Sequence, residues 1–341
     1  MPSKRKRNVV NQKSKKFQRK SFSVLFNTDH KGSIGGGDLY SHQIAECLSE
    51  VSEFRYFGHP YPRSFTKHHG FKAQFVNTSS LSDCDVFVSC SHFNIPSPIG
   101  KHRNILIVMF PDQNHAKFVQ KYDTIICCSQ FAAKYVQEYW KKKAYVVYPH
   151  IDRSVFYPPE VEPDRKSIIS VGRFFEEQGG HSKKQTVLIE ALAELDSFFH
   201  LSLVGSVYGD QDRIYLNKCK SLAKELNVNV SFYENVSQIE LANLYRSSSV
   251  YWHANGYESQ KPFETEHFGI SIEEAVACGC VPIIHKSGGH LEHCGIAWLN
   301  IDELVEATFL CGEKRPGYRP VITNLFSKEN MQQCLSDILL K

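Results

Sequence analysis

Residues 252–289 read WHANGYESQKPFETEHFGISIEEAVACGCVPIIHKSGG, and this stretch decides the fold. Its centre predicts a helix over residues 271–278, because a glycine follows at the place where helices commonly end. The apolar run Val281–Ile284 predicts a buried parallel strand. In an α/β sheet, this order places the start of the helix at the edge where ligands bind. Two carboxylates, Glu266 and Glu274, flank that helix start.

Strands and helices alternate along the rest of the chain, which predicts an α/β fold with parallel sheets. The predicted strands are residues 22–27, 85–89, 104–109, 124–128, 145–148, 167–171, 200–204, 228–233 and 250–253. The predicted helices are residues 39–51, 131–140 with Ser129 as N-cap, 187–195, 212–226, 237–246 and 327–340.

The length of 341 residues suits two domains. Residues 157–166, YPPEVEPDRK, carry three prolines and several charges, which predicts a linker. The expected domains are residues 21–156 and residues 167–320, with a last helical segment at residues 321–341.

The net charge of +4 hides a division between a basic segment and the rest of the chain. Residues 1–20 hold nine Lys and Arg and no acid, which leaves 31 bases against 36 acids elsewhere. The basic segment is interpreted as a disordered extension, an anionic-membrane contact or a nucleic-acid contact, and the sequence leaves all three open. No apolar run approaches the roughly 20 residues that span a bilayer. The eleven cysteines show no zinc-site spacing, so buried free thiols in the cytoplasm are expected.

The opening stretch resembles the donor-binding signature of retaining glycosyltransferases of family 4, which have the GT-B fold. The resemblance is carried by Glu266, Phe268-Gly269, Glu274-Ala275 and the turn Ala277-Cys278-Gly279. It implies two Rossmann-like domains whose parallel sheets face a cleft, with the acceptor on the first domain and a nucleotide sugar on the second. It also implies that the terminal helix packs back onto the first domain, and that neither a metal nor a cofactor is required.

Cations must stabilise a leaving diphosphate when no metal does so. Arg173 and Lys183 match the family residues that hold the donor phosphates, although most Lys and Arg are simply surface charges. The backbone amides of Phe268, Gly269 and Ile270 are expected to meet the sugar or phosphate, unless they only start the helix.

The resemblance implies that Glu266 is the catalytic-site carboxylate and that Glu274 binds the donor ribose. Glu274 has a second interpretation, because Ser271 and Glu274 have the spacing of a capping box. His253, on the strand before the loop, has the ordinary interpretation of a satisfied core histidine.

In the first domain, the loop containing Gly36 and Gly37 is interpreted either as a donor contact or as a tight strand-to-helix connection. Many family members carry a histidine near the transferred sugar where this chain has Met109 or Phe110. Asp112 and His115 are the candidates to replace it on the acceptor side.

The expected function is retaining, metal-independent transfer of a hexose from GDP-mannose or a UDP-sugar to a hydroxyl of a glycan or lipid-linked acceptor. The enzyme is expected to be cytoplasmic or peripheral at a membrane. A nucleotide-sugar epimerase of the same fold is one alternative. A non-catalytic nucleotide-sugar or nucleic-acid binding protein is another, and the basic segment leaves open a DNA-directed glycosyltransferase.

Overall fold

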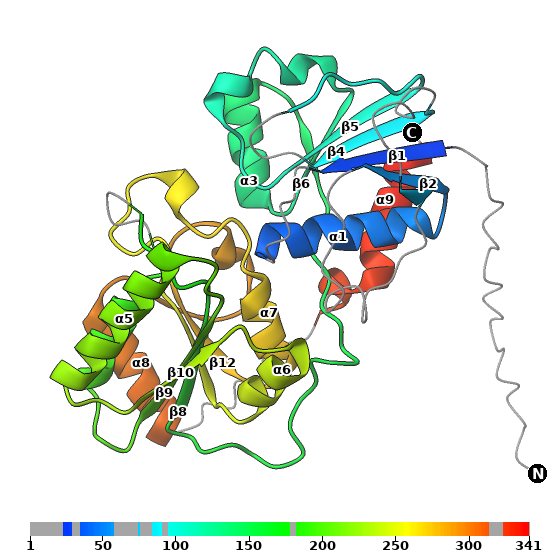
Figure 1. The fold of residues 1–341 in the computed structure, drawn as a ribbon. Helices are drawn as coiled ribbons and strands as arrows, with labels where there is room; N and C mark the ends of the chain where they lie inside the picture. The colour runs from blue at the N-terminus through cyan, green and yellow to red at the C-terminus, as the bar shows by residue number, and fades with distance from the viewer. Residues whose placement is uncertain are drawn as a thin grey trace, which may run out of the picture.

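The computed structural model describes residues 23–28, 35–57, 74–75, 84–90, 95–177, 182–313 and 323–340. They form two α/β domains, each built on a sheet flanked by helices (Figure 1). The first sheet has seven strands in the order β3-β2-β1-β4-β5-β6-β7, and the second has six in the order β10-β9-β8-β11-β12-β13. All strand pairs described in the two sheets are parallel. The predicted α/β fold is therefore confirmed.

The strands of the first sheet are β1 (Ser23–Thr28), β2 (Glu53–Phe57), β3 (Gln74–Phe75), β4 (Val86–Cys90), β5 (Arg103–Val108), β6 (Thr124–Cys127) and β7 (Ala144–Val146). Those of the second are β8 (Ser167–Val171), β9 (His200–Gly205), β10 (Val230–Glu234), β11 (Val250–His253), β12 (Val281–His285) and β13 (Ile296–Trp298). The α-helices are α1 (Gly36–Ser49), α3 (Gln130–Tyr135), α4 (Gln185–Ala193), α5 (Asp210–Glu225), α6 (Gln238–Arg246), α7 (Ile270–Ala277), α8 (Ile301–Glu313) and α9 (Lys328–Leu340).

Side-chain caps and one glycine fix the ends of several helices. The Ser129 hydroxyl accepts a hydrogen bond from the Ala132 amide at 3.1 Å, so the predicted N-cap of α3 is confirmed. Ser237 and Glu240 form a capping box at the start of α6. Gly279, at φ +91°, follows α7 in the left-handed conformation that favours glycine.

Helix α9 packs against α1 and completes the first domain (Figure 1). Three of its apolar side chains, Met331, Leu335 and Ile338, are buried in the core of that domain. The Lys328 ammonium lies 2.8 Å from Glu46 and 2.9 Å from Glu50, both on or next to α1. Helix α9 therefore belongs to the first domain, although the whole second domain lies between them in the sequence.

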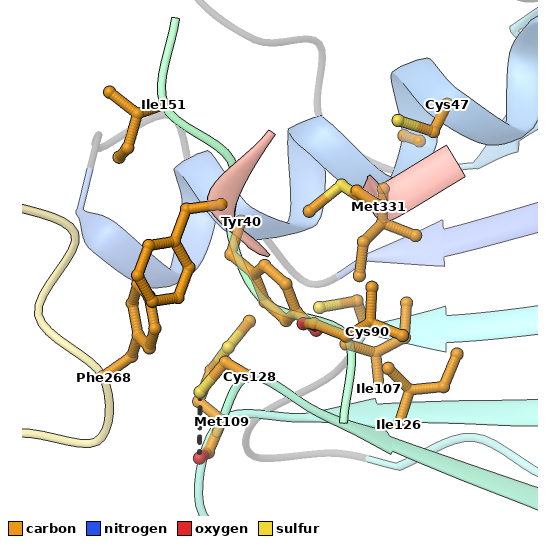
Figure 2. Close-up of a cluster of buried hydrophobic side chains, with 14 of the residues drawn as sticks. Tyr40, Cys47, Cys90, Ile107, Met109, Ile126, Cys128, Ile151, Phe268 and Met331 are labelled. Atoms are coloured by element: carbon orange, nitrogen blue, oxygen red, sulfur yellow. Dashed lines mark hydrogen bonds between the residues drawn. The ribbon is translucent and has the colours of Figure 1, made fainter. Parts of the chain in front are cut away.

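One apolar cluster contains buried side chains of both domains and joins them. Figure 2 shows Phe268 of the second domain in one cluster with Ile151, Tyr40, Cys128 and Met109 of the first domain, with Cys128 and Met109 below Tyr40 in this view. The Cys128 thiol donates to the Met109 carbonyl at 3.7 Å. This shared core holds the loop before α7 against the ends of the first sheet.

The eleven cysteines are all free, and nine of them are buried, as expected for internal thiols. Cys294 is exposed. Within the described ranges, no helix is long and apolar enough to cross a membrane. The basic segment 1–20 lies outside the described residues.

Candidate active site

The strand order brings two sequence-distant loops together in the second domain. β8 and β11 are paired neighbours at the point where the strand order reverses from β10-β9-β8 to β11-β12-β13. Loops that leave such a switch point form the ligand crevice of a doubly wound sheet. The loop after β8 carries Arg173, and the loop after β11 carries Glu266.

Glu266 is held from one side by three donors. Its Oε2 atom lies 2.7 Å from Lys183 Nζ, 3.3 Å from His253 Nε2 and 3.3 Å from Asn255 Nδ2. Burial by itself raises the pKa of the Glu266 carboxyl, but the Lys183 ammonium and the His253 contact outweigh it and hold that pKa well below its usual range. The second oxygen, Oε1, takes no part in these three contacts. The carboxylate is thus ionised and oriented, with one oxygen left to meet a ligand.

His253 belongs to this cluster rather than being only a core histidine. It is almost fully buried, and burial lowers its pKa, so the neutral ring donates Nε2–H to Glu266. Its Nδ1 atom is buried without a hydrogen-bond partner among the described residues. The interpretation as a core histidine agrees with this burial, but only one of the two ring nitrogens has a partner among the described residues.

The glycine pair after β12 shapes the loop that carries Glu266. The Gly289 amide donates to the Glu266 carbonyl at 2.6 Å. A Cβ atom on Gly288 or Gly289 would collide with the backbone of Glu266 or His267. Gly288 also has φ +67°, which other residues rarely adopt. These glycines allow the backbones of two chain segments to come into direct contact, and this contact positions the backbone of Glu266.

Arg173 is anchored by a buried carboxylate on α5. Its Nε and Nη2 atoms each lie 2.9 Å from an oxygen of Asp212. The Asp212 side chain is 3% exposed, whereas that of Arg173 is 51% exposed. The hydrogen bonds to Asp212 raise the pKa of the Arg173 guanidinium. Nη1 takes no part in this bidentate pair, so the guanidinium is held in a fixed plane with one edge directed away from Asp212.

Helix α7 begins at Ile270, one residue before the predicted start, and no capping box forms there. Gly269, at φ +98°, is the N-cap, and no side chain caps the helix. The Ser271 hydroxyl pairs instead with the Tyr251 hydroxyl at 2.8 Å. The capping-box interpretation of Ser271 and Glu274 is therefore wrong, because the helix starts one residue earlier than the serine.

Glu274 instead lies buried in the second domain, 7% exposed, with the Tyr245 hydroxyl 3.3 Å from its Oε2 atom. Burial raises the pKa of Glu274 to about 7, and the Tyr245 hydrogen bond offsets only part of that rise. A carboxyl with this pKa exchanges its proton near neutral pH, which makes it sensitive to any ligand that donates hydrogen bonds to it.

We expect the Glu274→Gln variant to be more stable than the wild type above about pH 7, by about 2–4 °C in Tm or more. The reference pKa is 4.5 and the folded pKa about 7, so the folded state holds an extra proton between these values. The stability from that proton is complete below pH 4.5 and is lost as the pH rises to 7. Glutamine avoids the cost of ionisation. Thermal melts of both proteins at about pH 5 and about pH 8 test this, and an equal difference at the two pH values would contradict it.

The first domain meets the Glu266 loop through an aromatic ring. Phe110, just after β5, stacks on His267 with ring centroids 4.7 Å apart and planes inclined by 21°. Gly36 starts α1 close to α7, since a Cβ on it would lie 4.0 Å from the Cδ1 atom of Ile270. Gly37 follows in the first turn of α1. Both predicted glycines therefore lie at the end of α1 that approaches the second domain.

The structure places the other predicted site residues in distinct settings. Asp112 caps the short helix Gln113–His115 by accepting from the Asn114 amide at 2.9 Å, so Asp112 and His115 share one exposed to half-exposed turn. Phe268 is buried by its side chain among aromatic rings, and its carbonyl accepts from His293 Nε2 at 2.6 Å. The described contacts bring together Glu266 and Lys183, and they bring Gly36 to Ile270, but they give Asp112 and His115 no link to Glu266.

Sequence reasoning missed Asp212, Asn255 and Glu292. Their partners lie 39, 11 and 162 residues away along the chain, so no local spacing signals them. Within the described part of the chain, no three His, Cys, Asp or Glu gather in a way that could hold a metal ion.

Residues 156–295 match the family model described as glycosyl transferases group 1. The chain is 27% identical over 176 residues to the GDP-Man:Man(3)GlcNAc(2)-PP-Dol alpha-1,2-mannosyltransferase of Xenopus laevis, covering 49% of this chain and 35% of that protein. The mouse protein of the same description is 28% identical over 179 residues, with the same coverage. The chain thus matches about a third of the length of these relatives.

Solved structures share the fold over nearly the whole chain. Anabaena Alr3699/HepE in complex with UDP and glucose has a TM-score of 0.72 at 16% identity and covers 94% of this chain and 99% of its own. Sucrose-phosphate synthase (tll1590) from Thermosynechococcus elongatus has a TM-score of 0.69 at 16% identity, covering 94% and 98%.

Proposed function

We propose that the chain is a glycosyltransferase that moves a hexose from a nucleotide-diphosphate sugar to an acceptor hydroxyl, because residues 156–295 match the model of the glycosyl transferases group 1 family and the chain shares the fold of solved glycosyltransferase structures. The observation that carries the proposal is the environment of Glu266. An ionised carboxylate with one oxygen fixed by three donors and the other directed elsewhere suits recognition of a sugar at a strand-end crevice.

We assign a residue of the second domain to each part of the nucleotide-sugar donor. Lys183 and the outward edge of Arg173 bind the diphosphate, and the amides at the start of α7 add their dipole to the same charge. Glu274 accepts hydrogen bonds from the ribose and becomes ionised when it does so. Glu266 binds the transferred sugar through Oε1. Two cations and a helix start supply the positive charge that a leaving diphosphate requires, which supports transfer without a metal.

The stereochemical outcome is proposed to be retention. The acceptor hydroxyl attacks the anomeric carbon on the face from which the nucleotide leaves, and the departing phosphate oxygen takes the hydroxyl proton. The bond from the anomeric carbon to the phosphate oxygen breaks as the bond to the acceptor oxygen forms. Glu266 stabilises the positive charge that develops on the sugar ring, because its ionised carboxylate is largely shielded from solvent, with the side chain 19% exposed.

GDP-mannose is the favoured donor, and a lipid-linked mannose-containing glycan is the favoured acceptor. The matched relatives in Xenopus and mouse are described as GDP-mannose-dependent enzymes acting on Man(3)GlcNAc(2)-PP-Dol. The alternative donor is UDP-glucose, because a structure of the same fold is described as a complex with it. With a lipid-linked acceptor, the transfer reaction would take place at a membrane surface. There the nine Lys and Arg of residues 1–20 would interact favourably with anionic lipid.

Thermal melts with GDP, UDP, GDP-mannose and UDP-glucose identify the donor, because a ligand raises Tm according to its affinity and concentration. At about 100 times Kd, the expected stabilisation is about 2.7 kcal/mol, or several degrees for a domain of this size. The donor that raises Tm is then incubated with lipid-linked Man3GlcNAc2, and the product is analysed for an added hexose and its anomeric configuration. An inverted sugar formed without acceptor would instead identify an epimerase. Binding without any turnover would identify a non-catalytic nucleotide-sugar protein.

A further inference from the structure

Glu292, in the short helix Gly289–Glu292 of the second domain, reaches across to the first domain. Its Oε2 accepts from the Gln130 amide at 3.0 Å, and its Oε1 accepts from the Phe131 amide at 2.7 Å. The Tyr148 hydroxyl, after β7, donates to Oε2 at 2.8 Å. Three donors of the first domain therefore converge on one carboxylate of the second.

These contacts complete the cap of α3. The first amides of a helix have no partner inside the helix. In α3, the Ser129 hydroxyl satisfies Ala132, and Glu292 satisfies the two amides before it. Because a negative charge at a helix N-terminus also interacts with the helix dipole, the carboxylate is well matched to this place. Separation of the two domains would leave two amides of α3 without these partners.

The same segment is bonded directly to the Glu266 loop. Gly289, which starts the short helix, donates its amide to the Glu266 carbonyl at 2.6 Å. His267, which follows Glu266 in its loop, stacks on Phe110 of the first domain. The His293 ring, next to Glu292, donates to the Phe268 carbonyl at 2.6 Å. The segment that carries Glu292 is thus bonded on both sides of that residue to the loop that carries Glu266.

We propose that Glu292 is a positioning residue that fastens the first domain to the Glu266 loop and so sets the distance between the donor sugar and the acceptor side. This inference rests on the proposed function. The groups assigned above to the nucleotide, which are Arg173, Lys183, Glu274 and the amides at the start of α7, all lie in the second domain. The Glu292 contact is therefore expected to govern turnover rather than nucleotide affinity.

The test compares Glu292→Gln with the wild type. Glutamine keeps the size, but its NH2 group meets a backbone amide, so at least one of the two bonds to α3 is lost. Amide hydrogen exchange of Gln130 and Phe131 is expected to become about tenfold faster or more, while the amides of β6 keep their rates. With the donor and acceptor identified above, kcat is expected to fall about ten- to a hundredfold, with the Kd for the nucleotide changed less than about twofold.

Glu240→Gln is the matched control, because Glu240 also accepts from a backbone amide at a helix start, that of Ser237 within its own domain. It should leave α3 exchange and kcat unchanged. Tyr148→Phe, which removes the third donor, should have a smaller effect of the same kind as Glu292→Gln.

Unchanged exchange at Gln130 and Phe131 in the Glu292→Gln variant would overturn the cross-domain contact. Faster exchange with an unaltered kcat would overturn the positioning role. A parallel loss of nucleotide affinity would also overturn it, by showing that the second domain itself is damaged. A wild-type chain that transfers no sugar would refute the proposed function and the positioning role with it, whereas the contact itself is still decided by exchange.

Discussion

Replacing Glu266 with glutamine is expected to lower kcat by about 10³-fold while the protein stays folded. Glutamine fills the same volume and can still accept from Asn255 through its oxygen. It removes the negative charge that Lys183 and His253 now hold in place, and with it the stabilisation of a positively charged sugar in the transition state. The measurement is kcat with the identified donor, together with a thermal melt and the nucleotide Kd.

The matched control for this variant is Glu264→Gln. Glu264 lies two residues before Glu266, and its carboxylate accepts from Ser259 at 2.7 Å and from Lys261 at 2.9 Å. Its loss should change kcat less than about threefold, since its contacts are local. Turnover of the Glu266→Gln protein within about threefold of the wild type, with normal nucleotide binding, would refute the assignment of Glu266.

Removing Arg173 is expected to lower kcat/KM by about 10²- to 10³-fold, because a charge-assisted contact to the leaving diphosphate is lost. Arg173→Ala also leaves the buried Asp212 carboxylate without its guanidinium partner, with only the Tyr208 amide still donating to it, at a cost of about 1–3 kcal/mol in stability. The double variant Arg173→Ala/Asp212→Asn removes that cost. It should melt close to the wild type and remain as inactive as the single variant.

Arg213→Ala is the control, on α5 next to Asp212. Its guanidinium pairs with Glu234 at 2.6 Å, and the Arg213 side chain is about as exposed as that of Arg173. Loss of an exposed pair costs roughly 0–1 kcal/mol and should leave kcat/KM unchanged. If the double variant regained activity as well as stability, Arg173 would be a structural residue and its assignment to the phosphates would be wrong.

Much of the second domain could be predicted from the sequence because its strands are short apolar runs bounded by polar residues. The predicted strands Ser167–Val171 and Val250–His253 agree with β8 and β11 at both ends. In the first domain, no strand was predicted at β2 (EFRYF), because polar and charged residues interrupt its apolar pattern. β13 was also missed, because three residues are too few to show a period. Helix α8 was missed too, although its pattern is amphipathic.

The site was predictable where local chemistry fixes it and not where tertiary contacts do. Arg173 and Glu266 follow strands that can be read from the sequence, so their place at the strand ends could be foreseen. The role of Ser271 could not be foreseen. The helix starts at Ile270, after a left-handed Gly269, and the Ser271 hydroxyl pairs with the Tyr251 hydroxyl instead of capping the helix. Cross-domain contacts such as Glu292 with α3 depend on how two finished domains meet, which no periodicity encodes.

The packing of α9 against α1 of the first domain has a consequence for biogenesis. During translation, the second domain can fold as soon as its own residues emerge, since its sheet uses none of α9. The first domain has emerged earlier but still lacks the apolar side chains of Met331, Leu335 and Ile338 that cover α1. Domains usually fold in the order of their synthesis, the N-terminal one first. Here the second domain can be complete before the first, because only the first requires α9. Until α9 docks, the nascent chain therefore leaves uncovered the part of α1 that α9 covers in the folded protein.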